Sequence, residues 1–440
     1  MSVFLAKGTR DFLPAQMRNR QWVIDRLREV FARFGFEPLE TPAFERIETL
    51  LGKYGEEGDR LIYRILKRGK HAALGEADLA LRYDLTVPLA RVVAMNPQLR
   101  LPFKRYQIQP VWRADRPQKG RFREFWQCDV DTVGTTSSVA DAECLAVVTA
   151  SLEALGFEAY TVRLNDRRIL TSLAAAAGAA HREMDVLVAI DKLDKIGVAG
   201  VSEALRAKGL ADDNIARLWD SLDVPEDNPG ALASLEQKLD ARGAEGVAAL
   251  RDVLAAAEHL GVPTSRLRVD PSLARGLDYY TGPVFEAEVV EPAVGSICGG
   301  GRYDHLIGMF SGRDIPAVGV SLGLERIIAV MEAQGMLPGA QPTARVLVTV
   351  FDDRTRTRSL EAAAVLRAAG IATDLYLGEG RLKNQLKQAN ARGYPWLIVI
   401  GPDEVAAGAV SLKDLTTGEQ EALSLEGAIR KLAGQPRPKG

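Results

Sequence analysis

The first long pattern of apolar residues begins after Pro14 and repeats at intervals of three or four positions. Charged side chains occupy the positions between them, and Gly35 follows the last one. The apolar positions are Val23, Leu27, Val30, Phe31 and Phe34. This spacing predicts an amphipathic helix of about five turns that ends at the glycine.

Two apolar runs between Tyr106 and Gly134 predict a pair of antiparallel strands. The segment between them, RADRPQKGR, is basic and contains Pro117 and Gly120, so it indicates a long loop rather than a tight turn. Long ordered loops in compact domains are usually functional. We therefore expect this loop to belong to a site.

Residues 164–268 are rich in Ala, Leu, Asp, Glu and Lys at helical spacing, and they separate two β-rich regions. Beyond them, YTGPVFEAEVV predicts a strand, SICGGGRYDHL a strand entering a glycine turn, and PAVGVSLGLERIIAVMEAQ a strand followed by a long helix. The pattern indicates a helical insertion into an antiparallel β-sheet flanked by helices.

The pattern changes again after MLPGAQPTA, a segment with the composition of a linker. The apolar runs RVLVTV, IATDLYL and WLIVIG are separated by helical segments around 357–369 and 381–392. A hairpin around Thr417-Gly418 and a short helix follow. This alternation predicts a small C-terminal α/β domain.

Composition adds limits to this picture. The 440 residues are 47% hydrophobic and 26% charged, which is typical of a globular protein of about three domains. The formal charge of -2 gives no overall attraction to nucleic acid, so contacts with RNA must come from local basic patches.

The cysteines Cys128, Cys144 and Cys298 are far apart and form no C-x-x-C pair, which argues against disulfides and a zinc site. Lys7 and Arg10 interrupt any signal sequence, and no run approaches the roughly 18 apolar residues of a membrane span. We expect a cytoplasmic protein without a membrane segment.

Several common catalytic motifs are absent. The chain has no P-loop, no H-E-x-x-H, and in GEGRLK only an incomplete dinucleotide fingerprint. GVSLG at 319–323 matches a serine-nucleophile elbow, but that architecture needs a later histidine, and the last histidine is His305. We interpret Ser321 as part of a strand-to-helix turn, and we expect no protein-held metal cluster.

Three segments, 105–131, 274–286 and 299–327, combine glycine, arginine and acidic residues. Arg113 lies at the end of a predicted strand and Arg326 at the start of a predicted helix, both in apolar surroundings where an unpaired guanidinium is costly. Each arginine taken alone is explained by a salt bridge. Together with other glycine- and arginine-rich motifs they indicate an anion site.

These motifs resemble those of class II aminoacyl-tRNA synthetases, and specifically the histidyl-tRNA synthetase family. The resemblance begins at GTRDFLP and includes LRYDLTVPLAR at 81–91, RGLDYYTG at 275–282 and the motif 3 arginine in GLERI. GFEPLETPAFE, with Pro42, is similar to motif 1, which supports the dimer of this class. REFWQCDVD departs from many bacterial members and is closer to the eukaryotic form.

The resemblance implies an α+β fold: a class II antiparallel β-sheet flanked by helices, a helical insertion, and a C-terminal α/β anticodon-binding domain. It implies a catalytic core over 1–163 and 269–335, an insertion over 164–268 and an anticodon-binding domain over 345–437. The implied reaction is ATP-dependent activation of L-histidine to histidyl-adenylate with release of pyrophosphate, then transfer to the 3′ end of tRNA(His). Mg²⁺ on the ATP phosphates and a homodimer are also implied.

The resemblance assigns roles to residues of this chain. Catalysis falls to three arginines that bind oxyanions: Arg113 and Arg275 at the α-phosphate and histidine carboxylate, and Arg326 at the γ-phosphate. The ATP site would also include Phe125, stacked on adenine, and Arg123. The histidine site would include Asp84, Thr86 and Gln127 around the α-amino group, and Asp131, Tyr279 and Tyr280 around the imidazole.

Simpler interpretations stay open for some of these residues. Asp84 precedes LTVPLARVVAM and suits a helix N-cap, and Tyr279-Tyr280, beside Arg275 and Asp278, could alternate in a strand with one ring in the core. Two basic sets could bind tRNA or could simply be solvated. They are Arg116, Lys119, Arg121 and Arg123 for the acceptor stem, and Arg381, Lys383, Lys387 and Arg392 for the anticodon arm.

Two alternative functions remain at this stage. The family includes a non-catalytic, histidine-sensing regulatory paralogue of ATP phosphoribosyltransferase, which lacks the C-terminal domain and the complete arginine motif. A synthetase for another amino acid would share the class II core but not RGLDYYTG. The C-terminal domain, the complete arginine motif and RGLDYYTG are all present in this sequence, which favours the ligase.

Overall fold

A computed structural model describes residues 3–118, 120–275, 279–289, 291, 295–339, 342–379 and 381–434. Lys119 and Asp278, both named above, lie outside this set. The chain forms two compact units, one of Met1–Asp11 and Arg20–Leu337, the other of Phe12–Asn19 and Pro338–Gly440. The described part of the chain contains no helix with the length and hydrophobicity of a membrane span. The cytoplasmic location stays a prediction.

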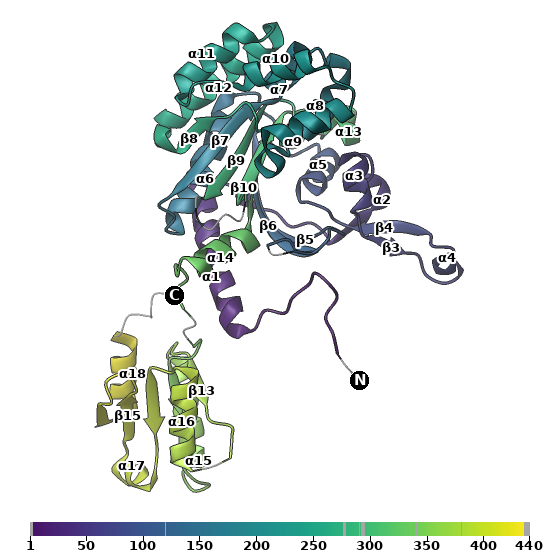
Figure 1. Ribbon diagram of the computed structural model, residues 1–440. Helices are drawn as coiled ribbons and strands as arrows, with labels where there is room; N and C mark the ends of the chain where they lie inside the picture. Colours follow the sequence, from purple (N-terminus) through teal and green to yellow (C-terminus); the bar gives the residue numbers. More distant parts are fainter. Residues whose placement is uncertain are drawn as a thin grey trace. The chain divides into compact units, whose positions relative to one another are not determined.

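An eight-stranded sheet forms the centre of the first unit (Figure 1). Its order is β1-β5-β6-β11-β10-β9-β7-β8, and neighbours are antiparallel except at the β1-β5 and β7-β8 edges. In that order the strands span Glu37–Pro38, Phe103–Trp112, Glu124–Val133, Ala317–Gly323, Cys298–Arg302, Pro283–Val289, Tyr160–Asp166 and Leu267–Val269. The predicted antiparallel sheet and its flanking helices are confirmed.

The two faces of this sheet differ because β6 alternates apolar and polar residues. Cys128 and Val130 enter the hydrophobic core, where they meet buried residues of three covering helices. These are α1 (Pro14–Arg33), α6 (Ser138–Ala154) and α14 (Leu324–Ala333). Gln127, Asp129 and Asp131 lie on the opposite face, which is left for a polar cleft. The predicted first helix is confirmed, and Gly35 after it has a φ of 74°.

The helical insertion is confirmed, with different limits. Its helices lie together at one end of the sheet (Figure 1). They are α7 (Arg167–Ala176), α8 (Glu183–Ile190), α9 (Leu193–Ala207), α10 (Asp212–Leu222), α11 (Asn228–Lys238) and α12 (Ala241–His259). The first three residues of the predicted range belong to β7, because Leu164 packs in the sheet core and Asp166 caps α7 by accepting a bond from the Arg168 amide.

A second small sheet was not predicted. It has the order β2-β4-β3, from Phe44–Arg46, Ala77–Leu81 and Arg64–Leu66. Short helices surround it: α2 (Ile47–Leu50), α3 (Gly55–Arg60), α4 (Lys70–Ala73) and α5 (Thr86–Met95), with α13 (Gly308–Ser311) packed against α5. The strands are too short and too exposed to carry a clear alternating pattern.

The second unit contains a five-stranded sheet of order β13-β12-β14-β15-β16, spanning Thr373–Leu375, Val346–Val348, Trp396–Val399, Val410–Asp414 and Gln420–Leu423. Helices α15 (Arg356–Ala368) and α18 (Leu425–Gly434) pack with Val346 and Ile398, whereas α16 (Leu382–Arg392) packs with Leu347 and Leu397. Helices on both faces explain why the central strands are continuous apolar runs. Helix α17 (Pro402–Ala407) completes this predicted α/β domain.

Candidate active site

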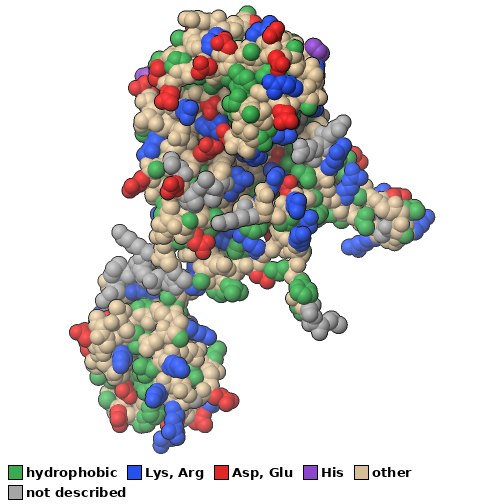
Figure 2. Space-filling model, viewed as in Figure 1, with side chains coloured by type: hydrophobic (Ala, Val, Ile, Leu, Met, Phe, Trp, Pro, Cys, Tyr) green, Lys and Arg blue, Asp and Glu red, His purple; other side chains and the backbone are tan. Residues whose placement is uncertain are grey.

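A polar cleft opens on the face of β6 that the helices leave uncovered. Lys and Arg side chains gather around the hollow in the middle of the first unit (Figure 2). The cleft is lined by ten of the residues singled out in the sequence: Asp84, Thr86, Arg113, Phe125, Gln127, Asp131, Arg275, Tyr279, Tyr280 and Arg326. Residues as far apart in the chain as Asp84 and Arg326 thus converge on one surface.

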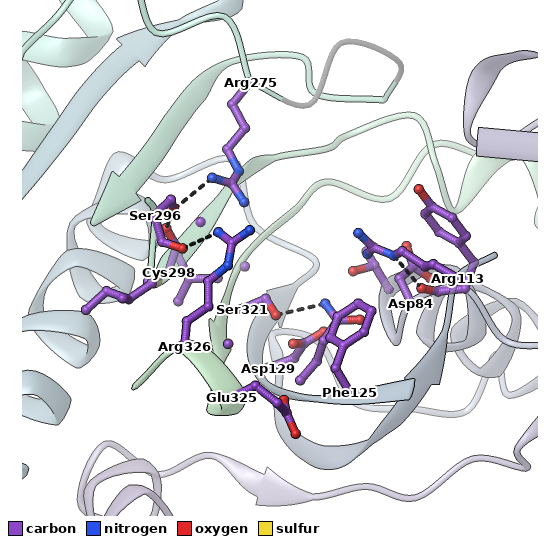
Figure 3. A pocket seen from close by; sticks show the side chains of 18 of the residues that line it. Asp84, Arg113, Phe125, Asp129, Arg275, Ser296, Cys298, Ser321, Glu325 and Arg326 are labelled. Atoms are coloured by element: carbon purple, nitrogen blue, oxygen red, sulfur yellow. Dashed lines mark hydrogen bonds between the residues drawn. The ribbon is translucent and has the colours of Figure 1, made fainter. Parts of the chain in front are cut away.

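The three arginines lie on two walls of this cleft (Figure 3). Arg275 and Arg326 approach the same residue from one wall: Arg275 donates to the Ser296 hydroxyl at 2.9 Å, and Arg326 donates to the Ser296 carbonyl at 2.5 Å. Arg113 lies across the cleft, where it donates to the Tyr83 carbonyl at 3.1 Å. Burial, with the nearby charge of Arg275, lowers the pKa of Arg326, which indicates a place for an anion between the walls.

The position of Arg275 depends on an acid that pairs with it and on a glycine that leaves room for it. It forms an ion pair with Glu286 of β9, and although burial lowers the pKa of the arginine, this acid together with Tyr280, Cys298 and Tyr279 raises it overall. Gly299 of β10 lies directly below the guanidinium: a Cβ there would be 2.7 Å from Nη2 and closer still to Cζ. The glycines of SICGGGRYD therefore give a guanidinium room to lie over the sheet.

Asp84 lines the cleft and also accepts a hydrogen bond from the first turn of α5, close to the capping role that its sequence position suggested. Its Oδ1 accepts bonds from the Val87 amide at 3.1 Å, near the start of α5, and from the Tyr54 hydroxyl at 2.9 Å. Burial raises the pKa of this carboxyl, whereas the Val87 amide and the Tyr54 hydroxyl lower it. Tyr279 and Tyr280 precede β9 rather than alternating within it, and their rings lie 4.7 Å apart in the cleft.

At the deep end of the cleft, Asp131 is surrounded by partners. Arg105 of β5 is fully buried and lies 2.7 Å from Asp131 Oδ2, and the Tyr303 hydroxyl donates to Oδ1. Gly319 of β11 pairs with Asp131 of β6. A Cβ at this glycine would collide with Asp131 Oδ1 and lie 2.8 Å from the Val130 carbonyl. Burial raises the pKa of Asp131, and Arg105 opposes that shift.

Glu325 connects three distant parts of the chain next to Arg326. Its Oε1 accepts from Arg20 of α1 at 2.9 Å, and its Oε2 accepts from the Trp126 amide of β6 at 2.8 Å. Arg10 lies 3.7 Å from the same carboxylate, with its guanidinium stacked 3.3 Å from the centre of the Phe122 ring. The carboxylate thus fixes the start of α14 against the strand that carries Phe125.

Arg123 is not among the described residues that line the cleft. Its side chain donates to the Asp115 carbonyl at 3.0 Å and packs against Gly8, whose carbonyl accepts from the Arg123 amide at 2.9 Å. Gly8 has a φ of 87°, a conformation that glycine adopts readily, and its missing side chain allows this close approach. Arg123 therefore ties the base of the predicted loop to the N-terminal segment.

Several other residues at this cleft could not be recognised from the sequence. Arg105, Tyr303 and Asp129 are buried there, but their relation to the cleft depends on pairing between strands. Ser321, interpreted as part of a turn, lies on β11 and accepts from Gln127 Nε2 at 2.8 Å. All three cysteines are buried, and burial raises the pKa of Cys298 to about 12, so its thiol stays neutral.

The cleft combines features that suit a nucleotide and an amino acid. Guanidinium groups on two walls can bind several phosphate and carboxylate oxygens, because each is planar, permanently charged and rich in donors. Phe125 presents a ring about 5.1 Å from the Arg113 guanidinium. Buried carboxylates on the floor can accept from nitrogen donors of a ligand.

Comparisons with known proteins agree with this chemistry. Residues 8–327 match the model of the family described as histidyl-tRNA synthetase, and residues 345–435 match that of an anticodon binding domain. Histidine–tRNA ligases of Cytophaga hutchinsonii and Gloeobacter violaceus are 43% and 44% identical, and the alignments cover 97% and 98% of this chain and 99% and 98% of the relatives. A crystal structure of histidyl-tRNA synthetase from Nostoc sp. PCC 7120 has a TM-score of 0.84 at 32% identity, covering 98% of this chain and 99% of that one.

Proposed function

The chain belongs to the histidyl-tRNA synthetase family and is a histidine–tRNA ligase that uses ATP, histidine and tRNA, and on this premise we propose roles for its residues. Histidine attacks the α-phosphorus of ATP with its carboxylate, pyrophosphate leaves, and the adenylate then transfers histidine to tRNA. The step needs no proton from the protein. Its main requirement is stabilisation of the negative charge that gathers at phosphorus.

We assign that stabilisation to the three arginines. Arg113 and Arg275 hold the α-phosphate and the histidine carboxylate from opposite walls, and Arg326 holds the γ-phosphate. Support comes from the converging donors at Ser296 and the lowered pKa of Arg326, since like charges brought together are stable when an anion lies between them. Phe125 stacks on the adenine, and Arg123 holds the loop base.

The amino acid is placed along the floor of the cleft. Asp84, Thr86 and Gln127 receive the α-ammonium group, and Asp131 with Tyr279 and Tyr280 receive the imidazole. Asp131 supports this assignment because it is buried with Arg105 and Tyr303 as fixed neighbours, so a ligand without a nitrogen donor would leave its charge poorly compensated. Such a site can discriminate by roughly 10⁴ or more.

We propose that magnesium arrives on the phosphates of ATP. Among the described residues, no group of three His, Cys, Asp or Glu side chains could hold a metal ion. Glu325 in the cleft is paired with Arg20, and Glu286 beside the cleft is paired with Arg275, so neither offers a free carboxylate. A cation coordinated by phosphate oxygens and water fits these residues and would neutralise the leaving pyrophosphate.

The tRNA contacts we propose are electrostatic. Arg116 and Arg121 are exposed on the loop between β5 and β6 and would meet the acceptor stem. Four exposed side chains of the second unit would meet the anticodon arm: Arg381, Lys383, Lys387 and Arg392. Arg392 also lies 3.3 Å from Asp374, and this carboxylate partly neutralises the positive charge that Arg392 offers to RNA.

A homodimer is supported by the surface around motif 1. Phe44 of β2 is 51% exposed and Leu66 of β3, in the same small sheet, is 55% exposed, and exposed apolar side chains on one small sheet suit a contact surface. We expect the wild-type chain to sediment as a dimer and Phe44→Asp to shift it toward monomer. A wild-type chain that sediments as a monomer at micromolar concentration would contradict this proposal.

The arginine assignment is tested by ATP–pyrophosphate exchange. Arg275→Ala should leave ATP and histidine binding largely intact while lowering histidine-dependent exchange by at least about a hundredfold, because removing one preorganised donor costs roughly 3 to 4 kcal/mol. Arg116→Ala is the matched control: it should keep exchange and lower only transfer to tRNA. Unchanged exchange in Arg275→Ala would refute the assigned role.

A further inference from the structure

The floor of the cleft contains three acceptors on one face of a single strand. Gln127, Asp129 and Asp131 alternate along β6, with side chains about 6.8 Å apart along the strand and all on the cleft side. Each is at most 9% exposed. Only the outer two have roles in the site as proposed above, so Asp129 in the middle lacks an explanation.

These acceptors are not satisfied within the protein. Among the described residues, Gln127 Oε1, Asp129 Oδ1 and Asp131 Oδ2 have no aligned hydrogen-bond donor, although Arg105 lies close to Asp131 Oδ2 as an ion-pair partner. Buried polar atoms of folded proteins are almost always paired, so a row of unpaired acceptors along one cleft points to a ligand rich in donors.

The charge of the row is also unbalanced. Asp129 and Asp131 share one buried guanidinium, that of Arg105, whose Nη2 is 4.0 Å from Asp129 and 2.7 Å from Asp131. Where β6 pairs with β11, Asp129 lies opposite Ser321, whose neutral hydroxyl hydrogen-bonds to it. Two carboxylates therefore face one cation at the deep end, which favours a ligand group carrying N–H donors and positive charge.

We propose that Asp129 is a further specificity-determining residue, a second carboxylate that, together with Asp131, accepts hydrogen bonds from the N–H groups of the histidine imidazole. This inference rests on the proposed location of the imidazole beside Asp131. The ammonium end of the ligand already has Asp84, Thr86 and Gln127, whereas Asp129 belongs with Asp131 through Arg105 and faces the cleft beside Ser321 (Figure 3).

The burial of Asp129 destabilises the folded state. This cost distinguishes a residue that recognises a ligand from one with a purely structural role. Burial raises the pKa of Asp129 to about 7, and Asp131 adds to that shift, so the ionised carboxylate is disfavoured in the folded chain. A residue kept only for packing would stabilise the fold. Replacement by the isosteric asparagine should therefore weaken ligand binding without lowering the melting temperature.

The test compares two ligands of the full-length protein. L-Histidine carries one ring N–H, or two when its imidazole is protonated, whereas β-(2-thiazolyl)-L-alanine has a ring of similar size and no ring N–H. Asp129→Asn should raise the dissociation constant of L-histidine, measured by calorimetry, by about tenfold or more, as expected for a lost charge-assisted bond. The inhibition constant of the thiazole, measured as a competitor of histidine, should change by less than about threefold.

Glu124→Gln is the matched control, because Glu124 is an acid of the same strand that is exposed and bonds to the Trp112 indole at 3.1 Å. It should leave both constants unchanged. Unaltered histidine binding by Asp129→Asn would overturn the proposal, and so would an equal loss for both ligands, which would mean contact with the ammonium group. Either result leaves the arginine assignment standing, since that is tested separately by exchange in Arg275→Ala.

Discussion

Gly299 provides a sharp test of how Arg275 is positioned, because the residue that changes is not itself charged. A Cβ at position 299 would be 2.7 Å from Nη2 of Arg275 and closer to the centre of the guanidinium. Non-bonded heavy atoms need about 3.5 Å, so the guanidinium must move by on the order of 1 Å. The backbone tolerates alanine, since Gly299 lies in β10 and is not among the glycines with positive φ.

The expected magnitude follows from that displacement. A misplacement of about 1 Å in a positioned catalytic group can cost about a hundredfold in rate. Complete removal of a donor costs roughly 3 to 4 kcal/mol, or a few hundredfold. We therefore expect Gly299→Ala to lower kcat for histidine-dependent pyrophosphate exchange by about a hundredfold, approaching Arg275→Ala.

A double-mutant cycle separates this mechanism from general damage. If the methyl group acts by displacing the guanidinium, Gly299→Ala combined with Arg275→Ala should be no worse than Arg275→Ala alone. Thermal melting should be nearly unchanged, because the displaced end of the side chain is flexible and part of it is already exposed. Losses that multiply in the double variant, or a single variant with more than a third of wild-type exchange, would refute the reasoning.

Three further predictions concern other contacts of the cleft. Glu325→Gln should raise the KM for ATP in exchange assays by about tenfold while leaving the KM for histidine unchanged, because an amide cannot accept with both oxygens from Arg20 and the Trp126 amide; equal changes in both constants would count against it. The pKa of Asp129 is about 7 in the folded chain against about 3.9 when unfolded, so the folded state binds the extra proton and stability falls as pH rises between these values. The melting temperature of Asp129→Asn relative to wild type should therefore rise as the pH increases through that window, and it should stop rising above about pH 8. A difference in melting temperature that stays constant from pH 4 to 8 would contradict the buried charge. EDTA should abolish exchange and added Mg²⁺ should restore it, with no change in the melting temperature of the protein without ATP; destabilisation by EDTA would indicate a metal held by the protein itself.

Much of this protein can be read along the chain, because local patterns depend on neighbouring residues. The apolar spacing of the first helix and the alternation of Gln127, Cys128, Asp129, Val130 and Asp131 already indicate which face is buried. The motifs also indicated ten residues that line the cleft, and of the predicted ATP- and histidine-binding residues only Arg123 is absent from the described lining.

Other features depended on which strands pair, and that cannot be read from one strand alone. The register of β11 against β6 brings Gly319 to Asp131 and Ser321 to Asp129, and the register of β5 brings Arg105 beneath both acids. The bond from Arg20 to Glu325 joins residues 305 positions apart. The sequence by itself determined the elements and the residue types of the site, because periodicity and composition are local. Only the tertiary structure decided that two buried acids share one arginine, because charge balance in a cleft is set by groups that meet across the sheet.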